Sequence, residues 1–380
     1  PMLTISKLSK TKGVKTILFE VSFSLGDGAK VTLVGPNGIG KSTLLKIVAG
    51  EEQSDGGEIV FSKGLRVAYL PQEINLTQET SVGEYVLDAS GIKAIESRMR
   101  QLESDLENPA NMTEYCELQS SYGWLGGDAI ESKIKKILSG FGLPTNLDCP
   151  LQSLSGGQKA KAALTAVLLK EADIMLLDEP TNNLDLPAII WLEAYLKGCK
   201  SACLIVSHDR RFLDKVVSKV FEIDWQTRKL NIQNGNYSDY LSSKEKKLRR
   251  EKELFEIQEK EVSRLTAAAR EGRRWAAIGA KQVTSDNDKY IRGARRDRAA
   301  KASKKAKSLE KQIARVRTIE KPKERPSLNI GFDPEAGIGN HSILLDNVVA
   351  GYNSGFSLGP IKLEIAYGSR IAILGQNGVG

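Results

Sequence analysis

The stretch Val31-Thr-Leu-Val-Gly-Pro-Asn-Gly-Ile-Gly-Lys-Ser42 decides the fold of this 380-residue chain. Its apolar and β-branched start predicts a short buried strand, and the turn that follows matches the pattern GxxxxGK[ST]. The glycines let backbone N–H groups point into one concavity that holds phosphate oxygens, with a helix N-terminus behind them. Lys41 would reach the outer phosphates and Ser42 would offer a hydroxyl to Mg²⁺. The predicted phosphate-binding residues are Gly35, Asn37, Gly38, Gly40, Lys41, Ser42 and Thr43.

Two further apolar runs end in polar residues that can do chemistry. Residues 174–177 lead into the acid pair Asp178-Glu179, and residues 202–206 lead into Ser207-His208-Asp209. Helical patterns lie between them, and polar groups at the carboxyl ends of strands are typical of an α/β domain with a nucleotide site at the sheet edge. Asp178 would hold Mg²⁺ with Ser42, and Glu179 would orient and deprotonate an attacking water.

The segment Leu154-Ser-Gly-Gly-Gln158 is the most specific motif, because here the chain resembles the ATP-binding-cassette superfamily, whose signature is LSGGQ. Gln72, the D-loop pair Leu184-Asp185 and His208 complete the family's order of motifs. The resemblance implies that the signature residues contact ATP held by a second cassette. It also implies that Gln72 senses Mg²⁺ and water, and that His208 contacts the γ-phosphate; alone, His208 would read as a core histidine. The predicted signature residues are Leu154, Ser155, Gly156, Gly157 and Gln158.

One position departs from the pattern of the superfamily. Cassettes usually stack adenine on an aromatic residue upstream of the phosphate-binding turn, and the aligned position here is Lys12. We therefore expect weak adenine stacking in this site. Tyr352 is the aromatic expected at the equivalent place later in the chain.

The positive charge of the chain is concentrated in one segment. The whole chain has a net charge of +8, whereas residues 242–323 hold 26 Lys/Arg against 12 Asp/Glu, a net charge of +14. Apolar residues recur there at heptad-like spacing, and a break near 279–288 separates two helical patterns. The sequence predicts two long antiparallel helices, the first of about 36 residues and about 54 Å. A polyanion is the natural partner for such a segment. The alternative is a solvated helical hairpin whose charges only keep it soluble.

A repeat follows this segment. Arg370-Ile-Ala-Ile-Leu-Gly-Gln-Asn-Gly-Val-Gly380 matches Lys30–Gly40 nearly position for position. Two cassettes joined by a charged helical linker resemble the ABC-F family. Asp178-Glu-Pro-Thr-Asn-Asn-Leu-Asp185 is similar to the family's EPTNHLD motif, with Asn183 where histidine is usual, and Asn234-Gly-Asn-Tyr237 resembles the segment that leads into its linker. We expect a first cassette at 1–240, a basic helical-hairpin linker at 241–322 and, at 323–380, the β-rich start of a second cassette that ends inside its P-loop.

The ABC-F resemblance implies a cytoplasmic ATPase that uses ATP and Mg²⁺. Its linker would enter the ribosomal tRNA exit site, contact rRNA and approach the peptidyl-tRNA, either to modulate translation or to protect against antibiotics. Arginine forks bind phosphate and aromatics stack on unpaired bases, so we expect charge reversal at Arg295 and Arg296 to weaken ribosome binding. The predicted RNA contacts are Arg270, Arg273, Arg274, Lys281, Lys289, Arg292, Arg295, Arg296 and Arg298.

Hydrolysis is expected to be poor in the chain as given, because each active site needs the signature of a facing cassette. Two chains pairing as a homodimer could supply it, and the rate per chain would then rise with concentration. The stretch between Gln72 and Leu154 predicts compact helices without a projecting arm hairpin. Apolar runs far shorter than the ~20 residues that a membrane span needs argue against a span in this chain, and a basic hairpin between cassettes would be unusual in a subunit with a membrane partner. An importer ATPase subunit and a DNA-maintenance ATPase remain the alternative functions.

Overall fold

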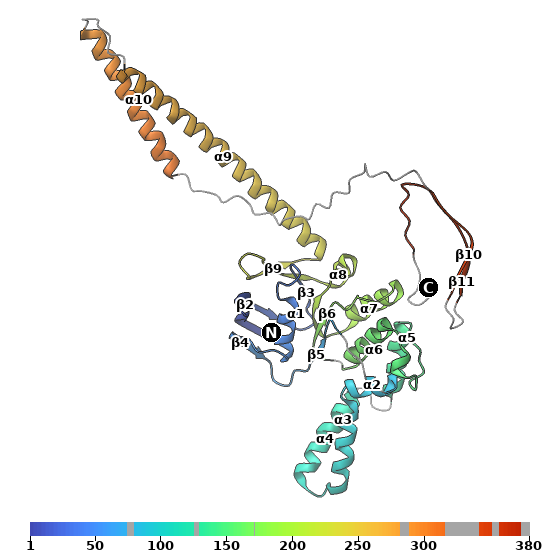
Figure 1. Ribbon diagram of the computed structural model, residues 1–380. Helices are drawn as coiled ribbons and strands as arrows, with labels where there is room; N and C mark the ends of the chain where they lie inside the picture. The colour runs from blue at the N-terminus through green and yellow to red at the C-terminus, as the bar shows by residue number, and fades with distance from the viewer. Residues whose placement is uncertain are drawn as a thin grey trace. The chain divides into compact units, whose positions relative to one another are not determined.

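The computed structural model describes residues 1–73, 80–124, 129–170, 172–281, 289–315, 342–351 and 357–373. The chain divides into two compact units, one of Pro1–Tyr240 with Pro334–Gly380 and one of Leu241–Asp333. The expected fold class is confirmed: an α/β P-loop domain is followed by a long helix pair and then by a short β-hairpin (Figure 1).

The central sheet of the α/β domain has the strand order β5-β6-β7-β3-β8-β9, parallel except for β9. Side chains of β6 alternate between two cores, Ile174 and Leu176 facing one and Met175 and Leu177 the other. A strand that is buried on both faces reads as a continuous apolar run, which is why the sequence revealed it. The strands are β3 (Lys30–Val34), β5 (Val67–Leu70), β6 (Ile174–Asp178), β7 (Ala202–Val206), β8 (Lys219–Ile223) and β9 (Leu230–Asn234).

A smaller antiparallel sheet, β2-β1-β4, covers one of these cores together with helix α1. Its inward residues, such as Leu3, Ile5 and Val21, alternate with exposed ones, as in a sheet with one solvated face. The bounds are β1 (Leu3–Lys12), β2 (Lys15–Leu25), β4 (Gly56–Phe61) and α1 (Lys41–Ala49).

Helices cover the other face of the central sheet. The apolar sides of α2, α5, α6, α7 and α8 form one core with that face, and Leu164, Leu168 and Leu192 lie fully inside it (Figure 1). The helices are α2 (Val82–Ala89), α5 (Ile130–Gly140), α6 (Gly156–Leu169), α7 (Leu186–Gly198) and α8 (Arg210–Val216). The order of these elements places the carboxyl ends of β3, β6 and β7 at one edge of the sheet.

The region between α2 and α5 differs from the sequence-based expectation. Helices α3 (Ile92–Leu102) and α4 (Pro109–Trp124) form a hairpin that projects from the domain (Figure 1), so the prediction of compact helices without such a hairpin was wrong. In α3 only Ile92 and Leu102, at its two ends, are buried. The helices are joined instead by a two-pronged ion pair, in which Arg98 donates to both oxygens of Glu114 at 2.7 and 2.9 Å.

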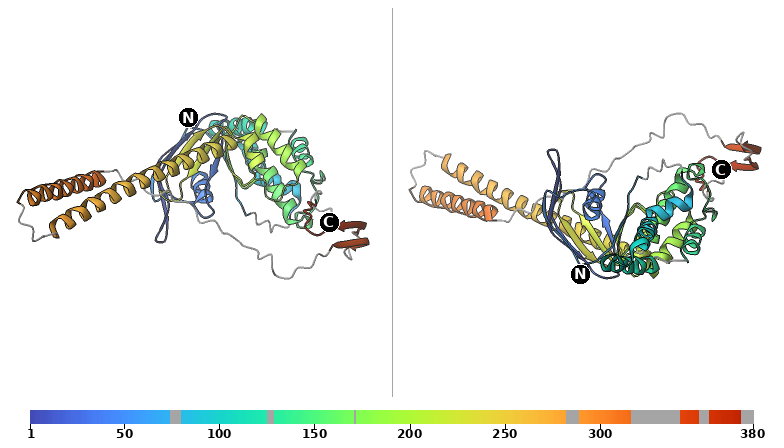
Figure 2. Two further views of the ribbon diagram at one scale, coloured as in Figure 1. Left: turned by 90° about the horizontal axis from the view of Figure 1, so that it is seen from above. Right: turned by 90° about the horizontal axis from the view of Figure 1, so that it is seen from below.

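The second unit holds the long helices α9 (Tyr237–Lys281) and α10 (Lys289–Arg315), which lie side by side in all views (Figure 2). At 1.5 Å per residue, the 45 residues of α9 span about 68 Å, more than the ~36 residues predicted. The helix extends beyond the predicted segment at both ends: it begins at Tyr237, where Asn236 accepts a hydrogen bond from the Asp239 amide at 2.8 Å, and it ends at Lys281. Small residues form the seam between the helices, with Gly272 facing the buried Ala306.

The last described elements are β10 (Ile343–Gly351) and β11 (Ser357–Ile365), which pair antiparallel. Residues 371–373, which repeat the strand sequence of residues 31–33, are not in a strand, since no neighbouring strand pairs with them in the part of the chain that is described. Tyr352 and the repeated turn at 375–380 lie outside the described residues. Across the described ranges, no helix combines the length and the apolar character needed to cross a bilayer.

Candidate nucleotide-binding site

The glycine-rich turn joins β3 to α1 and requires glycine at specific places. Gly38 and Gly40 have φ angles of 71° and 111°, in the left-handed region that other residues rarely adopt. A Cβ on Gly40 would overlap the side chain of Ile17 on β2. The turn therefore takes a shape in which backbone N–H groups can face a bound anion at the start of α1.

Lys41 is folded back over this turn. Its ammonium donates hydrogen bonds to the carbonyl oxygens of Gly35 at 3.0 Å and Pro36 at 3.1 Å. The charge is thereby held above the concavity of the turn, and an anionic phosphate would compete with two neutral carbonyls for it. A phosphate oxygen carries negative charge and a carbonyl oxygen does not, so the exchange adds an ion-pair attraction and favours phosphate.

Asp178 ends β6 beside the turn, with 2% of its surface exposed. Neither of its carboxylate oxygens has a hydrogen bond of good geometry with a described residue, although the Ser42 hydroxyl lies close enough to stabilise the carboxylate. Burial raises the pKa of Asp178, and nearby Ser42, Lys41 and Lys46 oppose that rise. A buried carboxylate without hydrogen bonds is costly unless a cation compensates it. Oxygen ligands are those that Mg²⁺ prefers, so Asp178 with the Ser42 hydroxyl fits a magnesium ion.

Glu179 follows in a left-handed conformation, with φ of 53°. Its Oε2 accepts a hydrogen bond from the backbone amide of His208 at 3.2 Å, and its Oε1 lies 3.4 Å from His208 Nε2. Burial raises the pKa of Glu179, while His208 lowers it. Backbone strain of this kind persists where the surroundings hold it and is common at active sites. The carboxylate is thus fixed next to an imidazole that is itself largely exposed.

These groups meet in one cavity of about 580 Å³, a size suited to a small-molecule ligand. It brings together predicted residues from the turn, from Gln72 after β5, and from the ends of β6 and β7. Lys12 also lines the cavity, and its ammonium lies 3.5 Å from Glu52. The predicted residues on the cavity wall are Asn37, Gly38, Gly40, Lys41, Ser42, Thr43, Gln72, Asp178, Glu179 and His208.

The signature segment lies elsewhere, at the start of α6, and does not line this cavity. Ser155 caps the helix: its hydroxyl oxygen accepts from the Gln158 amide at 3.3 Å, and its own amide donates to Gln158 Oε1 at 2.9 Å. This reciprocal capping box leaves the hydroxyl proton of Ser155 available for an acceptor beyond the helix. The exposed Gly156 adds a backbone amide at the positive end of the helix dipole.

The sequence reading missed a buried residue that links the signature helix to the D-loop. Lys161, with 3% of its surface exposed, donates to the carbonyl of Phe141 at 2.8 Å and to Asp185 Oδ1 at 3.1 Å. Asp185 is the N-cap residue of α7 and follows Leu184. A lysine one turn into a helix gives no sequence signal that it will be buried, so this contact could be found only in the structure.

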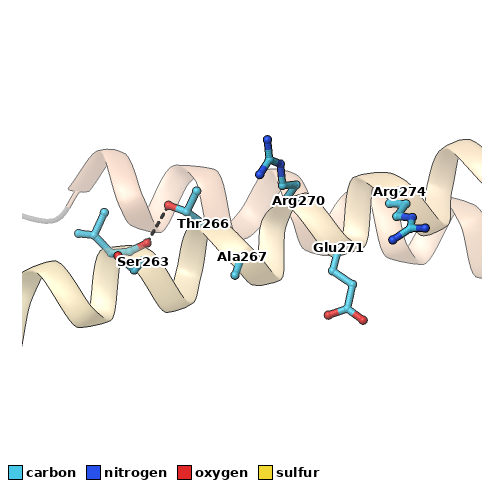
Figure 3. A pocket seen from close by; sticks show the side chains of 7 residues that line it. Ser263, Thr266, Ala267, Arg270, Glu271 and Arg274 are labelled. Atoms are coloured by element: carbon cyan, nitrogen blue, oxygen red, sulfur yellow. Dashed lines mark hydrogen bonds between the residues drawn. The ribbon is translucent and has the colours of Figure 1, made fainter.

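On the helix pair, the structure describes some of the predicted RNA contacts. Arg270 and Arg274 line an open hollow of about 540 Å³ on α9 together with Glu271 (Figure 3). Arg273 instead pairs with Glu310 of α10 at 2.6 Å, and Arg298 is exposed. The side chains of Lys281, Lys289, Arg292, Arg295 and Arg296 lie outside the described residues.

Comparison with known proteins agrees with this geometry. The ABC transporter family profile matches residues 18–182. The chain is 30% identical to the tylosin resistance ATP-binding protein TlrC of Streptomyces fradiae, over all of this chain and 70% of TlrC. It is 32% identical to ABC transporter F family member 5 of Arabidopsis thaliana, over 97% of this chain and 51% of that protein. It is also 32% identical to the ATP-binding protein YheS of Escherichia coli K12, over 100% and 55%. The chain spans about half the length of most of the curated relatives it matches.

Proposed function

This chain belongs to the ABC-F family of ATP-binding proteins, and from that premise we propose that the full-length protein is a ribosome-binding ATPase. Its proposed role is to modulate translation in the cytoplasm or to protect ribosomes from an antibiotic. The observation that carries the ATPase part is the cavity in which the phosphate-binding turn meets Asp178, Glu179 and His208.

In the proposed site, backbone amides of the turn and the Lys41 ammonium hold the β- and γ-phosphates. Ser42, Gln72 and Asp178 hold Mg²⁺, which when bound neutralises charge on those phosphates. Glu179 positions the attacking water and takes its proton, because its carboxylate is already fixed by the His208 amide. The raised pKa of Glu179 brings its basicity closer to neutral pH, as suits a general base.

Hydrolysis also needs a hydrogen-bond donor that faces the γ-phosphate from the side opposite the phosphate-binding turn. Leu154–Gln158 of the same cassette does not reach the cavity, so the proposed donor is the signature of another cassette. That cassette belongs either to the full-length protein or to a second molecule of this chain. The Ser155 hydroxyl proton and the amides of the α6 N-terminus would then stabilise the charge that develops on the phosphate.

ATP hydrolysis measured over a range of protein concentrations tests this arrangement. If two chains complete each other's sites, the rate per chain rises with concentration, and Ser155→Ala lowers it. The Ser155→Asp variant is the control, because aspartate keeps the helix cap but repels a phosphate. A rate per chain that is high and independent of concentration would contradict the proposal.

The helix pair is the proposed ribosome-binding element. Arg270 and Arg274 are exposed one turn apart on α9, and Trp275 beside them is 63% exposed. Guanidinium groups bind phosphates in a forked geometry, and an exposed indole can stack on an unpaired base. This combination favours RNA over a merely solvated surface, and the presence of an F family member and TlrC among the relatives supports it.

Co-sedimentation with ribosomes across a salt series tests the RNA contact. The double variant Arg270→Glu/Arg274→Glu should bind more weakly and with a shallower salt dependence, since each lost phosphate contact removes counterion release. Arg249→Glu/Arg250→Glu makes the same change of charge elsewhere on α9 and should have a smaller effect. Equal binding by both double variants and wild type would refute the assignment of this surface. Tighter binding to duplex DNA than to ribosomes would favour the DNA-maintenance alternative instead.

A further inference from the structure

Two cysteines and a lysine meet at the edge of the central sheet where β3 and β7 begin. Cys199 follows the last residue of α7, Cys203 is the second residue of β7, and Lys30 is the first residue of β3. Lys30 and Cys203 are direct neighbours in the register of the two strands. The nucleotide cavity lies at the opposite ends of these strands and uses none of the three residues.

The Lys30 ammonium holds the sulfur atoms together. Its Nζ lies 3.1 Å from Cys199 Sγ and 3.5 Å from Cys203 Sγ, and it also donates to the carbonyl oxygen of Cys199 at 3.0 Å. Both sulfurs therefore lie within reach of one cation. A nearby lysine stabilises a thiolate over a thiol, which is the usual route to a reactive cysteine.

The two thiols are not equivalent. Interaction with the Cys203 side chain, together with Lys30, lowers the pKa of Cys199 to about 6 against the effect of burial. The pKa of Cys203 is raised, by that same interaction and by its burial. The arrangement therefore favours deprotonation of Cys199 over deprotonation of Cys203.

The two cysteines also differ in their access to solvent. Cys199 lines a cavity of about 650 Å³ together with Tyr195 and Ser201, whereas Cys203 is 0% exposed and does not line it. A small oxidant that enters this cavity would therefore meet Cys199 first. The other two cysteines differ in surroundings: Cys116 is exposed and Cys149 is half-buried, and neither has a lysine contact within the described residues.

We propose that Cys199 is a peroxide-reactive thiol and that Cys203 resolves its oxidised form as an intramolecular disulfide. The Cys199 thiolate attacks one oxygen of hydrogen peroxide, the O–O bond breaks, and sulfenic acid and hydroxide form. The Cys203 sulfur then attacks Cys199 Sγ, an S–S bond forms, and the sulfenic oxygen leaves as water with the thiol proton. Two thiols and one peroxide thus give one disulfide and two waters, and a thiol reductant reverses the change.

Alkylation with iodoacetamide over a pH series tests the reactivity of Cys199. The rate at Cys199 should have its inflection near pH 6, and the exposed Cys116 of the same molecule gives the rate for comparison. At pH 6 the larger thiolate fraction of Cys199, offset by its lower intrinsic nucleophilicity, should make it about tenfold faster than an ordinary free cysteine thiol of pKa about 8.5. Lys30→Gln should raise the inflection at Cys199 by about one pH unit or more.

Trypsin gives a direct readout of the disulfide, because Lys200 lies between the two cysteines. Cleavage after Lys197, Lys200 and Arg210 puts Cys199 and Cys203 in separate peptides, 198–200 and 201–210. After treatment of the folded protein with hydrogen peroxide, these peptides should appear joined, two hydrogens lighter than their sum. Cys203→Ser should abolish the joined species and leave a Cys199 sulfenic acid that dimedone traps.

The peptide measurement on Cys203→Ser does not use Lys30→Gln, so a folding defect in Lys30→Gln would leave the proposal testable. An inflection for Cys199 at pH 8 or above in the wild type would overturn the proposal. So would peroxide-treated protein in which 198–200 and 201–210 remain separate while Cys116 is oxidised.

Discussion

Lys161 offers a prediction that reaches from one buried contact to the geometry of the proposed interface. The Lys161→Met substitution keeps the length and apolar stem of the side chain but removes its ammonium. The variant loses the hydrogen bonds from Lys161 to Phe141 and Asp185, and with them the ion pair between Lys161 and Asp185. The side chains of Lys161 and Asp185 are only 4% and 12% exposed, so water replaces little of what is lost.

The expected cost follows from these two contacts. Hydrogen bonds that involve a charged group contribute about 1.5–3 kcal/mol each, and breaking a buried ion pair costs roughly 3–5 kcal/mol. Because methionine recovers part of the apolar packing, about 3 kcal/mol is expected for Lys161→Met. In a domain of this size, 1 kcal/mol shifts Tm by about 2–4 °C, so the midpoint should fall by roughly 6–12 °C.

Far-ultraviolet circular dichroism on heating, without nucleotide, measures this shift. Lys159→Met is the matched control, because it makes the same change two residues earlier on α6 at a half-buried position. Asp185→Asn in the Lys161→Met background should cost less than in wild type, since the two substitutions remove the same interaction. If Lys161→Met lowers Tm no more than Lys159→Met does, the reasoning from the buried pair is refuted.

Three further outcomes are expected. Gly40→Ala should lower both stability and ATP affinity, because the added Cβ would overlap Ile17 and because the φ angle at this position is unfavourable for alanine. Gly50 also has a left-handed φ but lies in open space, so Gly50→Ala isolates the backbone effect in a thermal shift assay. Asp178 has a raised pKa, so the stability it contributes is present below its ordinary value of 3.8 and is lost as pH rises through the raised value. At pH 7.5, Asp178→Asn should therefore unfold no earlier than wild type without Mg²⁺, yet lose the Mg²⁺-dependent part of ATP binding in calorimetry; a lower Tm would contradict this. Lys12→Tyr should tighten ATP binding in calorimetry by adding a stacking partner for the base, and an unchanged affinity would place the base elsewhere.

The parts of the structure that depend on local sequence were predictable. The strand, glycine turn and helix at residues 30–49 follow from neighbouring residues, and the continuous apolar runs of β6 and β7 identify strands that are buried on both faces. The cavity could be anticipated because the carboxyl ends of parallel strands meet at one edge. Motif order alone thus indicated that Lys41, Asp178 and His208 would lie together, as the cavity wall shows.

The parts that depend on long-range packing were not predictable. Helical periodicity indicates which residues form α3 and α4 but not whether their faces will be covered, so the projecting hairpin was missed. The contacts of Lys161 join residues 20 and 24 positions away in sequence, and nothing in its own helix indicates them. The arrangement of Lys30 with Cys199 and Cys203 likewise exists only because β3 and β7 pair.

The most direct test of the central claim is calorimetric titration of a non-hydrolysable ATP analogue into the protein, with Mg²⁺ and with EDTA. The account predicts one nucleotide bound per chain, tighter with Mg²⁺, and binding that is lost in Lys41→Ala but retained in Lys46→Ala, which removes an exposed lysine from the same helix. Equal affinity of the Lys41→Ala and Lys46→Ala variants for the analogue would contradict it.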